Sequence, residues 1–205
     1  MLWQIASGIR AKTLVYRFTG PPERWRVESR TAREAWIRAS QSSIALLFAA
    51  DGQRRHRFLR FLRSGFLGYF LVREDKWIGY GWCATPDSGR PPHLPRWAGG
   101  VGAYWIFECC VRHGACPEGS CQQLLAHLVT FAFVRESSPL LLCEMQPENL
   151  TWRQAALQAG FTPLGVLSAY RLWFPGVGAI ALGGIWRRDV VHAPEIAALE
   201  SMLRH

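Results

Sequence analysis

The chain has 205 residues, of which 49% are hydrophobic and 19% are charged, and this composition excludes a disordered or fibrous protein. Its net charge of +9 comes almost entirely from arginine, because lysine occurs only at positions 12 and 76. The arginines are dispersed and match no nucleic-acid-binding motif, so we expect them to serve an anionic cofactor or an acidic protein rather than DNA or RNA.

Apolar residues recur with strand or helix periods through the first half of the chain. A Pro- and Gly-rich connection over 85–102 has no regular pattern, and a segment of this length is either a functional element or a plain surface insertion. The predicted elements before it are a strand at 12–18, two helices between Ser29 and Leu62 with a break near Asp51, and strands at 68–72 and 77–83 joined at Glu74 and Asp75.

The second half alternates strands and helices. The predicted elements are strands at 104–111, 140–146, 162–173 and 179–186, and helices at 120–135, 151–159 and 194–203. Residues 172–186 are uncharged but too short to span a membrane, and Pro175-Gly176 predicts a turn of a buried hairpin there. The element order predicts an α/β fold with a mixed sheet in a single domain.

Six cysteines stand at positions 83, 109, 110, 116, 121 and 143. The first ten residues lack the basic start and apolar run of a secretory signal, so we expect reduced thiols and a cytoplasmic protein. Cys116 and Cys121 have no His pair or second close Cys pair to complete a zinc site, and we expect no metal. Burial as small apolar side chains is the simpler interpretation of these cysteines.

Two segments carry the functional signal. The segment from Val111 to Leu125 reads VRHGACPEGSCQQLL, and it runs from a strand through a Gly-bearing turn into a helix, a geometry that points backbone N–H groups at a phosphate. The segment from Asn149 to Phe161 reads NLTWRQAALQAGF and places a Gly-Phe pair just after a helix. In this order and spacing the two segments resemble the acyl-coenzyme A site of the GNAT superfamily of N-acyltransferases.

The resemblance covers about residues 66–173 and implies a GNAT-like fold with a mixed, mostly antiparallel central sheet flanked by helices. It implies one domain over 1–205, with an N-terminal strand and helices at 1–65, a donor-binding core at 66–173, and a C-terminal hairpin strand and helix at 174–205. It also implies acetyl-CoA or another acyl-CoA as the acyl donor.

The turn that holds the coenzyme A pyrophosphate departs from the family pattern. At its six positions the chain has Cys116, Pro117, Glu118, Gly119, Ser120 and Cys121. Only Gly119 matches the pattern, Pro117 has no N–H to donate, and Glu118 brings a negative charge to the anion. Arg112 and His113 could supply compensating positive charge, although a solvated side chain is the simpler interpretation of Arg112. The cofactor-binding residues implied by the resemblance are Cys109, Val111, Cys116, Glu118, Gly119, Ser120, Cys121 and Asn149.

Asn149, Gly160 and Phe161 keep the family's second spacing, in which the Asn caps or positions the helix beside the pantetheine arm. Many members place a proton-donating Tyr seven residues after this Asn, but here that residue is Ala156. Tyr170 is the nearest phenol that could replace it as the general acid, and an ordinary strand Tyr is the alternative.

Glu108 lies at a strand position where the resemblance implies a general base for the acceptor amine. An ion pair with one of the arginines is an equally good interpretation of this carboxylate. Cys109 and Cys110 have no assignable His and carboxylate to activate them, so we expect direct attack of the amine on the thioester rather than an acyl-cysteine intermediate.

The sequence therefore predicts an N-acyltransferase that moves an acetyl or longer acyl group from acyl-CoA to a primary amine on a small molecule or a peptide. An acyl carrier protein as donor is an alternative, because its phosphopantetheine has no pyrophosphate and would demand less of the altered turn. A non-catalytic GNAT-like binding or assembly module is a second alternative.

Overall fold

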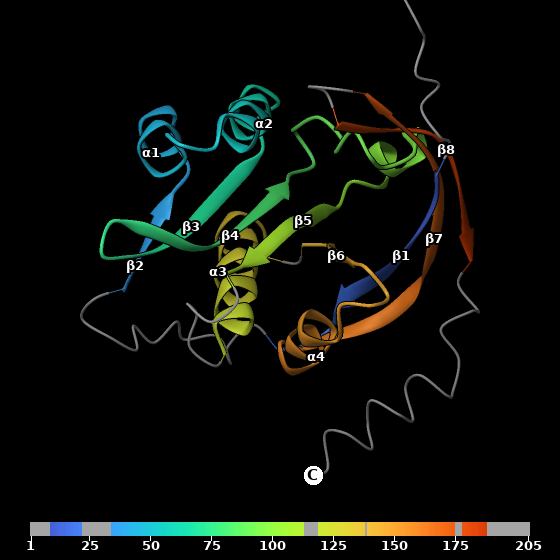
Figure 1. Cartoon of the computed structure of the whole chain (residues 1–205). Helices are drawn as coiled ribbons and strands as arrows, with labels where there is room; N and C mark the ends of the chain where they lie inside the picture. Colours follow the sequence, from blue (N-terminus) through green and yellow to red (C-terminus); the bar gives the residue numbers. More distant parts are fainter. Residues whose placement is uncertain (1–8, 22–33, 113–118, 138, 175–177, 188–205) are drawn as a thin grey trace, which may run out of the picture.

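The computed structural model describes residues 9–21, 34–112, 119–137, 139–174 and 178–187 (Figure 1). The described strands are β1 (Ile9–Phe18), β2 (Glu34–Arg38), β3 (Leu67–Arg73), β4 (Lys76–Ala84), β5 (Tyr104–Val111), β6 (Leu141–Met145), β7 (Phe161–Phe174) and β8 (Gly178–Arg187). The described helices are α1 (Gln41–Leu47), α2 (Gly52–Arg63), α3 (Ser120–Arg135), α4 (Leu150–Gln158) and a 3₁₀ helix, η2 (Arg96–Val101).

All eight described strands form one sheet in the order β2-β3-β4-β5-β6-β1-β7-β8. Neighbouring strands are antiparallel except for β5 and β6, which run parallel. This arrangement confirms the predicted α/β class with a mixed, mostly antiparallel sheet. The division of the chain into three segments stays a prediction.

Helices cover both faces of this sheet (Figure 1). One face packs against α3 and α4, in a cluster that includes Ile106 of β5 and Cys143 of β6. The opposite face packs against α1, α2 and the 85–102 segment, in a cluster that includes Trp82, Phe107 and Leu94. Strand alternation assigns each residue to one of the two faces, so the central strands are buried on both sides.

The hairpin between β3 and β4 follows the prediction closely. Arg73 pairs with Lys76, which leaves Glu74 and Asp75 as a two-residue loop. Both residues have positive φ, at 50° and 59°, and a turn with two positive φ values matches the twist of the flanking strands.

The predicted helix at the N-terminal side of Asp51 is largely wrong. Residues 34–38 form β2, which pairs antiparallel with β3, and α1 begins only at Gln41 after a capping box made by Ser40 and Ser43. Ala35, Trp36 and Ala39 have helical spacing, but pairing with the otherwise open edge of β3 supplies backbone hydrogen bonds that local periodicity does not reveal. The predicted 194–203 helix and the turn at 175–176 lie outside the described residues.

Candidate active site

Strands β5 and β6 separate partway along their length. They pair only at Tyr104–Leu141, Trp105–Leu142 and Ile106–Cys143. Beyond this point β5 stays paired with β4 through Cys110 and Val111, while β6 stays paired with β1. In the described chain, the outer half of β5 therefore has no ladder to β6. We call the place where these two strands separate, beyond Ile106 and Cys143, the opening.

A β-bulge lies in this unpaired half. Tyr80 pairs with Cys110 and Trp82 with Phe107, so Glu108 and Cys109 together oppose the single residue Gly81. Glu108 has φ +48°, which is unusual for a residue with a side chain. The bulge turns Cys109 toward the α3 cluster and leaves Cys110 against the α1–α2 cluster.

The carboxylate of Glu108 meets a cation from α2. Arg57 Nη1 donates to Glu108 Oε1 at 2.5 Å, and the two side chains are 37% and 28% exposed. The ion pair considered for Glu108 is thus present. It holds the carboxylate on the α1–α2 side of the bulge, and the role of Glu108 as a base stays a prediction.

The cysteines near the bulge do not resemble nucleophiles. Burial raises the pKa of the Cys109 thiol well above its usual value, and the thiol donates to the carbonyl of Phe107 at 3.6 Å. Cys121, in the first turn of α3, is buried in the same core cluster. Burial in an apolar surround keeps a thiol protonated and inert, which agrees with direct attack.

The start of α3 lies next along the chain. Gly119 occupies the N-cap with φ +82° and makes no side-chain cap hydrogen bond, while Ser120 is buried. Val111 ends β5 with its side chain beside Gly79. Cys116 and Glu118 lie outside the described residues, and so does His113.

Arg112 lies on the other side of the sheet from α3. Its guanidinium is 4.3 Å from the centroid of the Trp77 ring, and Arg54 approaches the same ring at 5.0 Å. Trp77 belongs to the α1–α2 cluster, so Arg112 makes a cation–π contact on that side.

The second motif becomes a capped helix. Asn149 accepts a hydrogen bond from the Trp152 N–H at 3.3 Å and caps α4. Gly160, with φ +74°, follows the end of α4, and Phe161 then enters the core against Phe18 with a ring separation of 5.3 Å. The spacing thus has a complete structural explanation, and a contact of Asn149 with a pantetheine arm stays a prediction.

Tyr170 is not brought to Glu108. It lies on β7, and β6 and β1 stand between that strand and β5. Three strand spacings separate them by about 14 Å, and the Tyr170 side chain is 48% exposed. The phenol nearer to Glu108 is that of Tyr80, whose pKa is raised by burial and then by the neighbouring Cys110 and Glu108.

Sequence reasoning missed a second pair of polar side chains on the α1–α2 face. His93, in the 85–102 segment, hydrogen-bonds through Nε2 to Oε1 of Glu144 on β6. Strand alternation could have predicted that Glu144 faces the other side of the sheet from Cys143 and Met145, which is the side that the 85–102 segment covers. No signal in the sequence pointed to His93, because its partner is 51 positions away.

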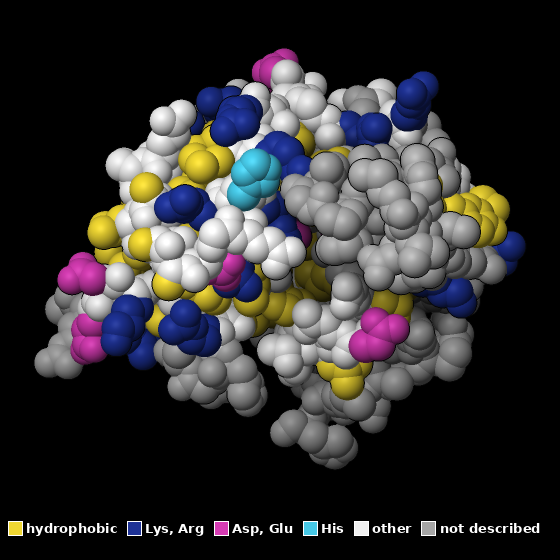
Figure 2. All heavy atoms as spheres, turned by 45° about the horizontal axis from the view of Figure 1, so that its top comes forward, with side chains coloured by type: hydrophobic (Ala, Val, Ile, Leu, Met, Phe, Trp, Pro, Cys, Tyr) yellow, Lys and Arg dark blue, Asp and Glu magenta, His cyan; other side chains and the backbone are white. Residues whose placement is uncertain are grey.

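Figure 2 shows the molecule from the side of α1 and α2. The surface is hollowed at its centre, with hydrophobic side chains at the floor and Lys and Arg side chains along the α1–α2 rim (Figure 2). Among the described residues, no group of three or more His, Cys, Asp or Glu could hold a metal ion, and no described helix is long and apolar enough to cross a membrane.

No protein-family model matches the sequence, and no curated protein matches it. Solved structures do match. A GCN5-related N-acetyltransferase-like protein from Streptococcus suis has a TM-score of 0.54 at 12% identity over 85% of this chain. An acetyltransferase of the GNAT family from Colwellia psychrerythraea has a TM-score of 0.51 at 14% identity over 78% of this chain.

The chain spans 61% and 55% of the length of these two proteins. At such low identity the likeness concerns the fold. The protein has the GNAT fold, as the resemblance of its two motifs predicted.

Proposed function

We propose that this protein is an N-acyltransferase that moves an acetyl or longer acyl group from acyl-CoA to a primary amine by direct attack. The observation that carries the proposal is the separation of β5 from β6, with a bulge at Glu108, within a GNAT fold. In this region the backbone N–H groups of Cys109 to Val111 could polarise a thioester carbonyl that enters the open edge.

The donor would lie between the α3 and α4 sides of this opening. Gly119, Ser120 and Cys121 form the start of α3, whose dipole favours an anion, and the N-cap residue Gly119 has no side chain. Asn149, at the start of α4, would flank the pantetheine arm. The resemblance adds Cys116 and Glu118 from the same turn.

Proton transfer would occur on the opposite, α1–α2 face. Glu108 is the proposed base for the amine, held by Arg57. Cys109 is partly buried and its pKa is raised by burial, which supports attack without an acyl-enzyme. Tyr170 as the proton donor stays a prediction from the sequence.

A carrier-protein donor is the second candidate. Arginines concentrate on α2, at positions 54, 55, 57, 60 and 63. Lys and Arg side chains border the hollow in Figure 2. A basic helix at the entrance of a site suits an acidic partner and speeds its association at low salt. The same helix is compatible with free acyl-CoA, so the two donors need a direct comparison.

The proposal is tested by titrating the protein with acetyl-CoA, longer acyl-CoA species and acyl carrier protein, and by following thiol release with a panel of primary amines. We expect saturable binding of at least one thioester and amine-dependent thiol release. Glu108→Gln should lower kcat by about 100-fold or more while donor affinity is retained, as for loss of a general base.

Glu136→Gln is the matched control, because Glu136 is an exposed carboxylate beyond the end of α3. It should leave turnover unchanged. Thioester binding without turnover with any amine would favour a non-catalytic module, and failure to bind any thioester would refute the proposal. Full activity in Glu108→Gln would remove only the assigned base.

A further inference from the structure

His93 and Glu144 lie where β5 and β6 begin to separate. Ile106 and Cys143 form the last pair of the parallel ladder, so Phe107 and Glu144 are the first residues beyond it. The ring of His93 lies 5.7 Å from that of Phe107 and hydrogen-bonds to Glu144. The 85–102 segment thus places an imidazole directly over the opening into which the thioester would enter.

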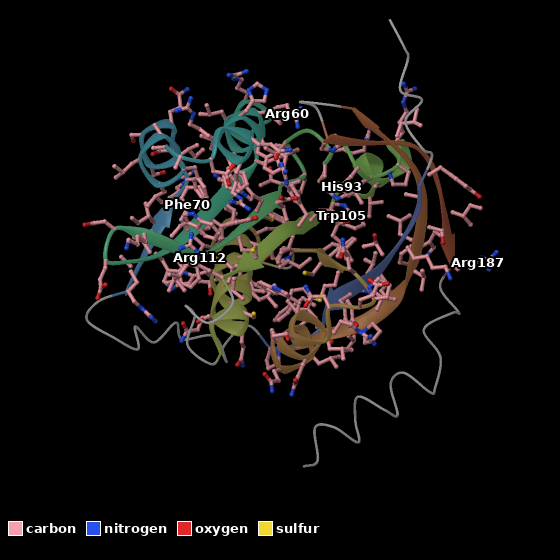
Figure 3. All side chains as sticks on the ribbon, in the orientation of Figure 1. Arg60, Phe70, His93, Trp105, Arg112 and Arg187 are labelled. Carbon is pink, nitrogen blue, oxygen red and sulfur yellow. The ribbon has the colours of Figure 1, made fainter. Side chains whose placement is uncertain are left out.

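The surroundings of this pair are apolar. The side chains of His93 and Glu144 are 18% and 9% exposed, and Leu94, next along the chain, is fully buried. Trp105, one position before the last rung on β5, faces the same side and is also buried. His93 and Trp105 are both labelled in Figure 3.

Two buried polar atoms lack a partner here. Within the described part of the chain, Oε2 of Glu144 and Nε1 of Trp105 make no hydrogen bond. Leaving a buried carboxylate oxygen unpaired costs free energy, and the cost is larger for a charged group than for a neutral one. An acceptor oxygen that is held ready but unpaired therefore suits a ligand that carries N–H donors, such as an ammonium group.

Glu108, the other carboxylate at the opening, is already in an ion pair. Glu108 accepts from Arg57, whereas the described residues give Glu144 no cation other than His93 when His93 is protonated. Nδ1 of His93 has no hydrogen-bond partner among the described residues. A neutral imidazole that donates from Nε2 to Glu144 would present Nδ1 as a proton acceptor.

We propose that His93 and Glu144 form the acceptor-amine site, in which Oε2 of Glu144 binds the substrate ammonium and Nδ1 of His93 takes the first of the two protons that the nitrogen loses. This inference rests on the proposed acyltransferase function. It identifies the acceptor as a primary amine that reaches the protein as its ammonium ion. Glu144 stabilises the imidazolium that forms, as a carboxylate does behind a catalytic histidine.

The ammonium transfers one proton to Nδ1 of His93 and becomes a neutral amine. The amine nitrogen then forms a bond to the thioester carbonyl carbon, and the C–S bond breaks with its electron pair on sulfur. Glu108, the base assigned above, takes the second proton lost by the nitrogen, and one proton reaches the thiolate. The products are therefore an amide, a free thiol and an imidazolium that returns its proton to solvent.

The test compares two acceptors with acetyl-CoA as donor. Ethanolamine and related alkylamines are protonated at neutral pH and need a base, whereas hydroxylamine is largely unprotonated and does not. We expect His93→Gln to lower kcat for alkylamines by about 100-fold or more, with little change in KM for acetyl-CoA or in the rate with hydroxylamine. Glu144→Gln should raise the KM for the alkylamine as well as lower kcat.

His56→Gln is the control, because His56 is exposed on α2. Equal losses with both acceptors in His93→Gln would show that His93 only ties down the 85–102 segment, and unchanged alkylamine turnover would also overturn the inference. Both results leave the acyltransferase proposal standing. Failure of the unmodified protein to bind acetyl-CoA would instead refute the proposed function.

A readout that needs no turnover is the tautomer of His93, measured by ¹⁵N NMR of the imidazole in the whole protein. The neutral ring should be in the Nε2–H form, and Glu144→Gln should shift it toward a mixture of the two forms. A ring with the same tautomer populations in both proteins would contradict the pair on which the inference depends.

Discussion

Two phenols occupy very different positions relative to the opening between β5 and β6. Tyr80 is buried on β4, and its pKa is raised by burial and then by Cys110 and Glu108, so its hydroxyl stays protonated at neutral pH. Tyr170 is half exposed on β7, beyond β6 and β1. A general acid for the departing thiolate has to be protonated and within reach.

Position therefore favours Tyr80 as the proton donor over the Tyr170 predicted from the sequence. We expect Tyr80→Phe to lower kcat about tenfold or more, and Tyr170→Phe to change it less than about twofold. Both variants keep the aromatic ring, so each removes only a hydroxyl. Steady-state thiol release measures the effect, and a larger loss in Tyr170→Phe than in Tyr80→Phe would restore the prediction from sequence.

Single residues could be predicted from sequence only where a local pattern marks them. The spacing of Asn149 from Gly160 correctly indicated a capped helix with a Gly just after it, because both features belong to one helix. The structure adds that this Gly has a positive φ. His93 and Glu144 had no such pattern. Their contact joins a loop to a strand 51 positions away, and only the packed fold brings them together.

The N-cap hydrogen bond of helix α4 can be tested by substitution of Asn149. Asn149→Ala removes the acceptor for the Trp152 N–H, and the loss of an N-cap should lower the free energy of unfolding by about 1 kcal/mol. For a chain of this size that corresponds to a fall in Tm of about 2–4 °C. Thermal denaturation measures it, and Asn149→Asp, which keeps a capping oxygen, is the control.

If Asn149 also contacts the donor, Asn149→Ala should weaken acetyl-CoA binding at a temperature where the protein is fully folded. A cap with only a structural role predicts unchanged affinity. A variant with wild-type Tm would contradict the capping hydrogen bond itself.

Elements with a strong local period were predicted well, and the short edge strand β2 was not. Strand β5 and helix α3 have the bounds that the sequence indicated, because each buries a continuous apolar pattern. Strand β2 was missed because five residues carry too little pattern to outweigh a helical spacing that continues around them. The decisive interaction, pairing with β3, is not local.

The role of the 85–102 segment also could not be predicted from the sequence alone. Its composition predicted a segment without regular structure, which could be either a functional element or a plain surface insertion. In the fold, it reaches from the end of β4 across the α1–α2 face, with His93 at β6 and Pro95 close to Gly184 of β8. Its position over the opening supports the functional interpretation, which the His93 variants test.

At the scale of the whole molecule, the fold holds a histidine in its neutral form. His127 of α3 packs between Trp36 of β2 and Tyr69 of β3, with ring separations of 4.3 and 6.1 Å. Burial lowers its pKa from 6.5 to about 4, and its Nε2 is unpaired among the described residues. The contact ties the helix layer to the edge of the sheet, so protonation of His127 opposes the folded state as a whole.

The sign of the pH effect follows from this shift. Between pH 6.5 and pH 4 the unfolded chain binds a proton at His127 that the folded protein does not, so stability falls as the pH falls through this window. We expect Tm to drop more between pH 7.5 and pH 5 in the unmodified protein than in His127→Phe, which keeps an aromatic ring but cannot titrate. Each 1 kcal/mol of difference corresponds to about 2–4 °C.

Thermal denaturation of both proteins, together with His56→Gln, measures this difference. His56 is exposed, so its removal should leave the pH dependence of Tm as it is in the unmodified protein. The remaining histidines and carboxylates are common to all three proteins and cancel in the comparison. Parallel Tm curves for His127→Phe and the unmodified protein would show that His127 gains its proton equally in the folded and unfolded states, and that β2 does not shield it from solvent.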